Sequence, residues 1–227
     1  EKALKIEFIC DIITCGYGVD DEDRDHHFAT STEDATKAYA YKTARLLDAD
    51  YSLVSYSGNG IVSGYTTQGN QVKAQRVPMF YEEFARSAGS YNGYSVSSTP
   101  WDFTRFVPDV VVINLGTNDA SYTGGDKELQ QEYADAYAEF LKKVRKDNPD
   151  AQIICALGVM GDTLYKAMCA AVENYTAQTG DEKVSTLHLT AQDGSKNGYA
   201  ADWHPTAASH DVAAAETAEM IKSVLGM

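Results

Sequence analysis

The opening stretch of the chain reads LKIEFI over residues 4–9 and continues as CDIITCGYG over residues 10–18. Residues 4–9 mix apolar and charged side chains in near alternation, a pattern that predicts a β-strand. The strand then opens into a short loop that contains Gly16 and Gly18. In an open α/β sheet, ligands bind at the carboxyl ends of the strands. The stretch therefore predicts the first strand of such a sheet and the first loop of a functional site.

The rest of the chain alternates predicted strands with predicted helices. Further strands are expected at residues 50–56, 110–115, 152–157 and 184–189. Helices are expected from the capping-type sequence Ser31-Thr32-Glu33-Asp34 to about Leu47, and at residues 126–146, 163–176 and 206–225. The β-branched run VVVINL at 110–115 is typical of a strand buried on both faces. This order predicts an α/β fold, a three-layer α/β/α sandwich around a mostly parallel, doubly wound sheet.

Residues 61–107 form the least regular part of the sequence. Only residues 79–88 hint at a helix, and the remainder is interrupted by Gly64, Gly69, Gly89 and Gly93. A long irregular stretch inside a compact domain is usually functional. Its aromatic residues have two interpretations, as the wall of a cleft or as a satellite core.

Chain length, net charge and hydropathy limit the number of domains and the kinds of partner that we expect. The 227 residues show no obvious linker, so we expect a single domain over residues 1–227. The net charge of −14 argues against a nucleic-acid partner. No apolar run approaches the ~18 residues of a membrane helix, so we expect no membrane partner.

Cysteine and acidic residues give no sign of a bound metal. The four cysteines have neither the spacing of a disulfide framework nor that of a zinc site. The acidic run at residues 20–25 lacks the ligand spacing of a calcium loop and is predicted to be a solvated loop. We therefore expect no metal and no cofactor.

Four loops fall where the predicted strands end, at residues 10–18, 57–60, 116–119 and 202–205. Acyl transfer requires a base, a group that orients the base, and donors aimed at a developing oxyanion. His204 is the candidate base, and Asp202 is the candidate acceptor of its Nδ1 proton. The candidate oxyanion donors are the backbone N–H groups of Ile12 and Gly60 and the side-chain amide of Asn118.

Each of these residues has a simpler interpretation when taken alone. Gly60 is typical of a turn, and Asn118 with Asp119 is typical of a helix cap. A lone histidine is more often structural than catalytic. Their common position at strand ends, in this order, favours one shared site.

The same loops resemble the four signature blocks of the SGNH (GDSL-type) hydrolases. The matching blocks are Asp11…Thr14, Ser55…Gly60, Gly116-Thr117-Asn118-Asp119 and Asp202…His204-Pro205. The strings ITCGYG (13–18), SGNG (57–60) and DWHP (202–205) look closest to carbohydrate esterase family two, the acetyl esterases of plant cell-wall polysaccharides, chiefly acetylated xylan. The resemblance spans the whole chain and implies a flavodoxin-like sandwich and a Ser-His(-Asp) acyl-enzyme mechanism. It places the oxyanion glycine and asparagine of the family on Gly60 and Asn118, and its histidine on His204.

The resemblance also implies a partner and a location. The expected partner is an acetylated plant cell-wall polysaccharide or oligosaccharide, handled outside the cell or at its surface. Aromatic residues suit stacking on sugar faces, and the residues expected to contact sugar are Tyr17, Tyr65, Trp101 and Trp203. The β-sandwich domain that precedes this one in the family is absent from the sequence, which favours an excised domain.

The sequence departs from the family at the nucleophile. Ile12 stands where the family has Ser, and Cys10 stands where it has Gly. Isoleucine has no lone pair and cannot form an acyl-enzyme, so the chain is predicted to be inactive or strongly impaired. Its N–H can still serve the oxyanion hole. Two alternatives remain, a thiol esterase that uses Cys10 and a non-catalytic carbohydrate-binding pseudoenzyme on the same scaffold.

A second departure concerns the acid of the triad. Asp202 lies two residues before His204, whereas most members of the superfamily have three. Either the Asp202 carboxylate or a backbone carbonyl therefore orients the imidazole.

Overall fold

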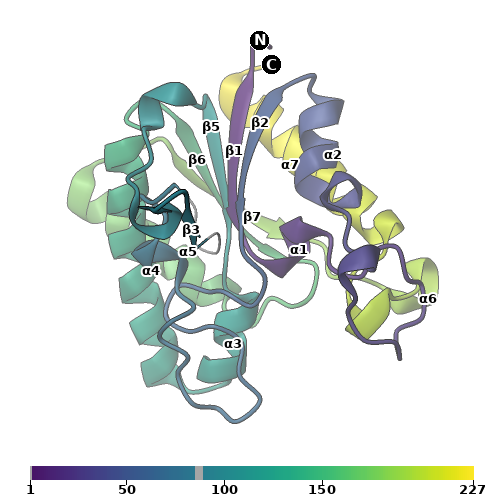
Figure 1. Ribbon diagram of the computed structural model, residues 1–227. Coiled ribbons are helices and arrows are strands. Elements are labelled where there is room, and N and C mark those ends of the chain that lie inside the picture. The colour runs from purple at the N-terminus through teal and green to yellow at the C-terminus, as the bar shows by residue number, and fades with distance from the viewer. Residues whose placement is uncertain (1, 85–88) are drawn as a thin grey trace.

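The computed structural model describes residues 2–84 and 89–227, and its central sheet has the strand order β2–β1–β5–β6–β7 (Figure 1). All neighbouring strands in this sheet are parallel. The strands are β1 Lys5–Cys10, β2 Asp50–Ser55, β5 Val110–Asn114, β6 Gln152–Gly158 and β7 Val184–Leu189, with a separate hairpin of β3 Ser90–Tyr91 and β4 Tyr94–Ser95. The helices are α1 Ile12–Cys15, α2 Tyr39–Leu46, α3 Thr117–Thr123, α4 Lys127–Asp147, α5 Tyr165–Thr179, α6 Gly194–Asn197 and α7 Ala207–Leu225.

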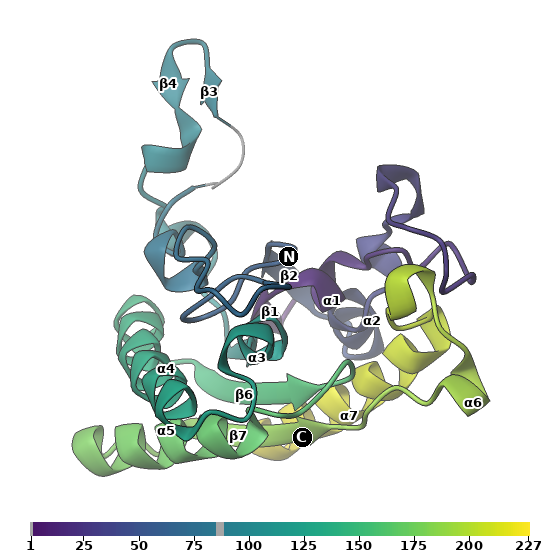
Figure 2. The same cartoon turned by 90° about the horizontal axis from the view of Figure 1, so that it is seen from below.

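Helices cover both faces of the sheet (Figures 1 and 2). Ile6 and Phe8 of β1 enter the core beneath α2 and α7, whereas Ile9 enters the core beneath α4 and α5. Neighbouring side chains separate in this way because successive residues of a strand point to opposite faces. The short helices α1 and α3 lie at one end of the sheet, and both chain termini lie at the other (Figure 1). The predicted three-layer α/β/α sandwich with a parallel sheet is confirmed.

The regular elements follow the sequence patterns closely. Every predicted strand of the main sheet occurs within one residue of its expected ends. Helices α4, α5 and α7 also occur where their periodic apolar residues predict them. Asp126 begins α4 by accepting hydrogen bonds from the N–H groups of Glu128 and Leu129.

The helix expected up to Leu47 is shorter than its capping sequence predicts. Residues 30–32 and 35–37 form two separate 3-10 turns, and α2 begins only at Tyr39. The Gly16 carbonyl accepts a hydrogen bond from the Asp34 N–H at 3.1 Å, and a Cβ on Gly16 would lie 2.2 Å from the Asp34 carbonyl oxygen. This contact with the loop after α1 holds residue 34 out of a helical path, so packing overrides the local signal.

Two further predictions of local structure need correction. Residues 79–84 contain no α-helix. Val77–Met79 form a single 3-10 turn, which is followed by further turn residues and an isolated bridge. Residues 85–88 of the expected helix lie outside the described residues. The structure also adds short helices that the sequence did not predict, α1, α3 and α6, of which α3 includes residues 117–119 of the predicted 116–119 loop. Asn118 and Asp119 are buried in its first turn rather than capping it, and Gly116 is the cap residue.

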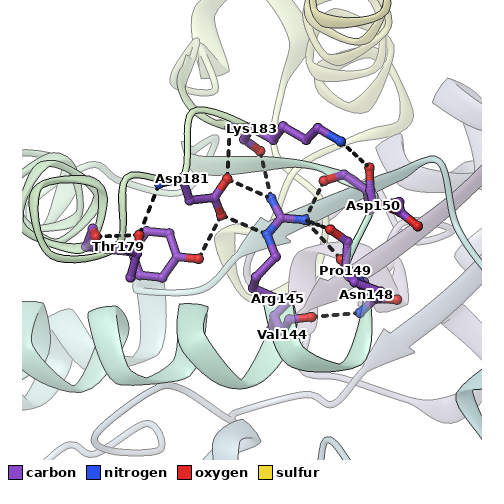
Figure 3. A network of polar contacts seen from close by, with 10 residues as sticks. Val144, Arg145, Asn148, Pro149, Asp150, Thr179, Asp181 and Lys183 are labelled. Carbon is purple, nitrogen blue, oxygen red and sulfur yellow. Dashed lines mark hydrogen bonds and ion pairs between the residues drawn. The ribbon is translucent and has the colours of Figure 1, made fainter.

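Arg145 lies at the end of the sheet opposite α1 and α3, where its hydrogen bonds join the segments that lead into two strands (Figure 3). Its guanidinium donates to the carbonyl oxygens of Asn148 at 2.9 Å and Ala151 at 2.7 Å, and to the Asp181 carboxylate at 2.7 Å. The Tyr175 hydroxyl donates to the same carboxylate at 2.7 Å. Because Ala151 precedes β6 and Asp181 precedes β7, one side chain fixes the entry of both strands.

Asp119 fixes the loop that follows β2. Its buried carboxylate accepts hydrogen bonds from the N–H groups of Ile61, Val62 and Ser63 at 3.0, 2.7 and 3.0 Å. Burial raises the pKa of Asp119 to about 6, and the three N–H groups act in the opposite direction. Gly60 makes this approach possible, because a Cβ there would lie 2.4 Å from Asp119 Oδ2 and 2.3 Å from the Ser63 carbonyl oxygen.

The contact between Gly60 and Asp119 gives the first prediction. Gly60→Ala should lower the free energy of unfolding by about 2 kcal/mol or more, because the added methyl group collides with backbone and carboxylate. Gly125→Ala is the matched control, since nothing lies within 4 Å of a Cβ at Gly125. Urea unfolding of both variants measures the difference. Equal stability of the two variants would contradict the proposed close approach.

Candidate functional site

A cavity of about 540 Å³ opens where β1, β2 and β5 end. Each of the four predicted loops contributes to its lining, through Ile12, Gly58, Asn118 and His204. A larger hollow of about 640 Å³ lies beside Arg145 at the other end of the sheet, and none of the predicted site residues lines it. The Ile12–His204 cavity is therefore the candidate site.

His204 is held as a neutral base. Its side chain is buried, and Nδ1 lies 3.1 Å from the Ala201 carbonyl oxygen and 3.0 Å from that of Asp202. Carbonyl oxygens only accept hydrogen bonds, so Nδ1 carries the proton and Nε2 is the basic atom. Burial lowers the pKa of His204 below its ordinary value, so the ring is neutral near pH 7.

The Asp202 carboxylate does not orient the imidazole, which corrects the first of the two sequence interpretations. It accepts hydrogen bonds from the Tyr17 hydroxyl at 2.7 Å and the Phe28 N–H at 2.9 Å, and lies 2.8 Å from His27 Nδ1. Asp202 has a left-handed backbone, with φ 51° and ψ 34°. This conformation presents its carbonyl, rather than its carboxylate, to His204 Nδ1.

The backbone donors at the cavity come from residues 12 and 58. The Ile12 N–H is the first of α1 and has no acceptor among the described residues. The Gly60 N–H donates to the Gln75 carbonyl at 3.1 Å, which corrects the expectation that it faces the site. Gly58 lines the cavity instead, at φ +73°, and its N–H has no acceptor in the described part of the chain. The sequence SGNG contains both glycines, and only the nearness of Gly58 to the strand end distinguishes them.

Asn118 lies in the cavity wall with its amide already engaged. Nδ2 donates to the Asn59 carbonyl at 2.8 Å and to Asp11 Oδ2 at 3.2 Å. Burial raises the pKa of Asp11 to about 7. An oxyanion would therefore have to replace the longer bond, to Asp11, in order to receive a proton from this amide.

Residue 12 presents only hydrocarbon to the cavity. Ile12 lines the cavity and packs against the core beneath α2 and α7. Cys10 cannot replace a serine, because its thiol is fully buried in that core, 3.3 Å from the Tyr39 hydroxyl. Burial raises the pKa of Cys10 to about 12, so no thiolate forms near pH 7.

Three of the four predicted sugar-contacting residues line the cavity, namely Tyr17, Tyr65 and Trp203. The Trp203 side chain is 48% exposed. Trp101 lies elsewhere and packs on Phe84, with ring centroids 5.8 Å apart, beside two other hollows. The Trp101 backbone N–H donates to the Glu82 carbonyl at 2.8 Å, and Trp101 does not line the cavity of His204.

Cavity residues that the sequence analysis missed include Ser57, Thr117 and Met160. Thr117 directly precedes the predicted Asn118 and Ser57 lies in the predicted 57–60 loop, whereas Met160 follows β6 in a loop without any recognised pattern. Within residues 2–84 and 89–227, no group of three or more His, Cys, Asp or Glu side chains is placed to hold a metal ion. No helix in these residues is both long and apolar enough to cross a membrane.

The known proteins to which the chain is similar include several that are named as esterases. The chain is 36% identical over 226 residues to the cellulase/esterase CelE of Acetivibrio thermocellus, an alignment that covers 98% of this chain and 26% of that protein. The acetyl xylan esterase Est2A of the rumen bacterium Butyrivibrio proteoclasticus superposes with a TM-score of 0.90 at 30% identity, covering 100% of this chain and 65% of that one. A family two carbohydrate esterase of Clostridium thermocellum, solved in complex with cellohexaose, gives a TM-score of 0.80 at 35% identity, covering 99% and 65%.

The chain thus spans 26% of the length of CelE and 65% of the length of each of the two solved chains. Residues 11–212 match the model of the GDSL-like lipase/acylhydrolase family. The matched range begins with the first site loop and includes the last. The parallel sandwich and the loops at its carboxyl edge agree with this match, and the chain belongs to the GDSL-like lipase/acylhydrolase family.

Proposed function

We propose that this chain is the esterase domain of a polysaccharide O-acetyl esterase of the acetyl xylan esterase type, with its nucleophile replaced. Its partner is an acetylated plant cell-wall polysaccharide or oligosaccharide, and its place of action is outside the cell or at its surface. The observation that carries the proposal is a neutral His204, held at Nδ1 by two carbonyl oxygens, in one cavity with residue 12.

The geometry supports a defined sequence of steps for a chain with Ser at position 12. His204 Nε2 takes the hydroxyl proton while the oxygen attacks the acetyl carbonyl. The N–H groups of residues 12 and 58 donate to the oxyanion, joined by the Asn118 amide when it releases Asp11. His204 then gives this proton to the departing sugar oxygen. In the second half of the reaction it takes a proton from the attacking water and passes it to the serine oxygen as acetate leaves.

Ile12 removes the acyl-enzyme route and leaves only the oxyanion donors and the base in place. The donors can still polarise a bound ester, and His204 can still accept a proton from water. In one characterised hydrolase, the site that remains without its triad accelerates the reaction by roughly 10³–10⁴ over water. The chain as it stands is therefore expected to be inactive or strongly impaired as an esterase.

Restoring the nucleophile tests the proposal. Ile12→Ser should raise the rate of 4-nitrophenyl acetate hydrolysis by about 100-fold or more, and should release acetate from acetylated xylan. Ile12→Ala is the matched control, because it removes the same bulk without supplying a hydroxyl. Adding His204→Ala to Ile12→Ser should abolish the gain. A folded Ile12→Ser variant no faster than Ile12→Ala would exclude the esterase proposal.

The pH dependence of the restored enzyme follows from the buried histidine. A general base works only when neutral, and burial lowers the pKa of His204 below 6.5. In Ile12→Ser, kcat/KM should therefore rise with pH along an acid limb centred below pH 6.5 and stay level through neutral pH. A pH profile of ester hydrolysis measures the limb. A midpoint above 6.5 would assign the base to another group.

A second function, carbohydrate binding without catalysis, is favoured by the aromatic wall of the cavity. Tyr65 and Trp203 line the same cavity as Ile12, and their rings can stack on a sugar whether or not residue 12 carries a hydroxyl. The proposal is that the same site binds a polysaccharide chain as a pseudoenzyme.

Calorimetry separates the aromatic residues inside the cavity from those outside it. The chain should bind xylo- or cello-oligosaccharides, and Trp203→Ala should weaken binding by about 10-fold through the loss of ring stacking. Trp101→Ala is the control, because Trp101 lies beside other hollows and should leave the affinity unchanged. No measurable affinity in the unaltered chain would remove the binding function.

A further inference from the structure

The loop at residues 17–28 is tied to the turn that carries His204. The Ala201 N–H donates to the Asp21 carbonyl and the Asp202 N–H donates to the His26 carbonyl, both at 2.9 Å. The sequence analysis took the acidic residues of this loop as merely solvated. Its backbone is instead part of the framework of the site.

The turn it holds is strained. Asp202 and Trp203 have φ values of 51° and 64°, in the left-handed region that favours glycine. Such residues are strained, and persist only where the surroundings fix them. The fixing contacts here come from the 17–28 loop, because Phe28 and Tyr17 donate to the Asp202 carboxylate and the Arg24 guanidinium lies 4.3 Å from the Trp203 ring centroid.

Tyr17 also contacts the imidazole directly. Its ring lies 4.0 Å from the His204 ring, centroid to centroid, with 30° between the planes. The Phe28 ring stacks on Tyr17 at 4.4 Å and 26°. The Tyr17 hydroxyl is anchored by its 2.7 Å bond to Asp202 Oδ2. The two carbonyls at Nδ1 fix the imidazole in its own plane, and Tyr17 restrains its tilt.

We propose that Tyr17 is a positioning residue for His204, and that the Asp202 carboxylate acts on the imidazole through the Tyr17 hydroxyl rather than by bonding to Nδ1. The inference rests on the proposed function, in which His204 is the base. It assigns Tyr17 a role besides contact with sugar. It also explains how an acidic residue two positions before the histidine serves the site without belonging to a triad.

A double-mutant cycle in the Ile12→Ser background tests the linkage between the two side chains. Tyr17→Phe keeps the ring and removes the hydroxyl, and Asp202→Asn removes the charge that the hydroxyl bonds. Each should lower kcat for 4-nitrophenyl acetate by about 10-fold with KM within about twofold, because a base displaced by a fraction of an ångström loses rate rather than affinity. The double variant should be no slower than the slower single variant, since both changes break one linkage.

Tyr175→Phe is the matched control. It removes a tyrosine hydroxyl that donates to an aspartate at the same 2.7 Å, from Tyr175 to Asp181 at the far end of the sheet. Any loss of stability caused by removing such a bond is therefore reproduced without touching the site. Tyr175→Phe should leave the kcat of Ile12→Ser unchanged.

A second measurement uses the chain with Ile12 and requires no activity. Titration of the His204 ring protons by NMR should give a pKa that rises toward 6.5 in Tyr17→Phe and is unmoved in Tyr175→Phe, because a loosened ring gains access to water. If Ile12→Ser proves inactive, this result still stands and the proposed function alone fails. Independent, multiplying effects in the cycle, or an unchanged His204 pKa in Tyr17→Phe, would overturn the inference.

Discussion

The parallel register of β1 with its two neighbours is the constraint on which the rest of the structure depends. Cys10, the last residue of β1, lies opposite Ser55 of β2 and Asn114 of β5. Three strands therefore end side by side at one edge of the sheet, and the chain must leave all three through loops that meet. Ile12, Gly58 and Asn118 come together for this reason, although more than 100 residues of sequence separate the first from the last.

His204 is placed at this edge of the sheet by a turn and not by the end of a strand. It follows no strand directly, and its turn depends on two left-handed residues that the neighbouring loop restrains. The backbone of that turn points two carbonyl oxygens at Nδ1, and burial keeps the ring neutral. The imidazole and its tautomer are therefore fixed by backbone geometry, without any need for a carboxylate beside the ring. This arrangement of the histidine does not depend on residue 12 having a hydroxyl, because its hydrogen bonds go to the backbone of residues 201 and 202.

The residues where sequence reasoning failed or left alternatives open share one physical cause. Gly60, Asp202 and Trp101 were each assigned a role from residue type and position, and in each case a contact with a distant segment decided the orientation. The Gly60 N–H is taken by Gln75, the Asp202 carboxylate by Tyr17 and Phe28, and the Trp101 backbone by Glu82. Hydrogen-bond partners far apart in sequence leave no local pattern, so residue type alone could not distinguish Gly58 from Gly60 or a carbonyl from a carboxylate.

The sequence by itself determined the order along the chain of the five main strands and the long helices, the sandwich around a parallel sheet, and the loops after β1, β2 and β5 that meet at its edge. It could do so because alternating and helical apolar patterns are local, and because parallel strands allow only one common end for their exits. Only the tertiary structure decided which atoms in those loops face the cavity. Those orientations depend on close packing and on distant hydrogen-bond partners, as when Gly60 admits the Asp119 carboxylate and Tyr17 stacks on His204.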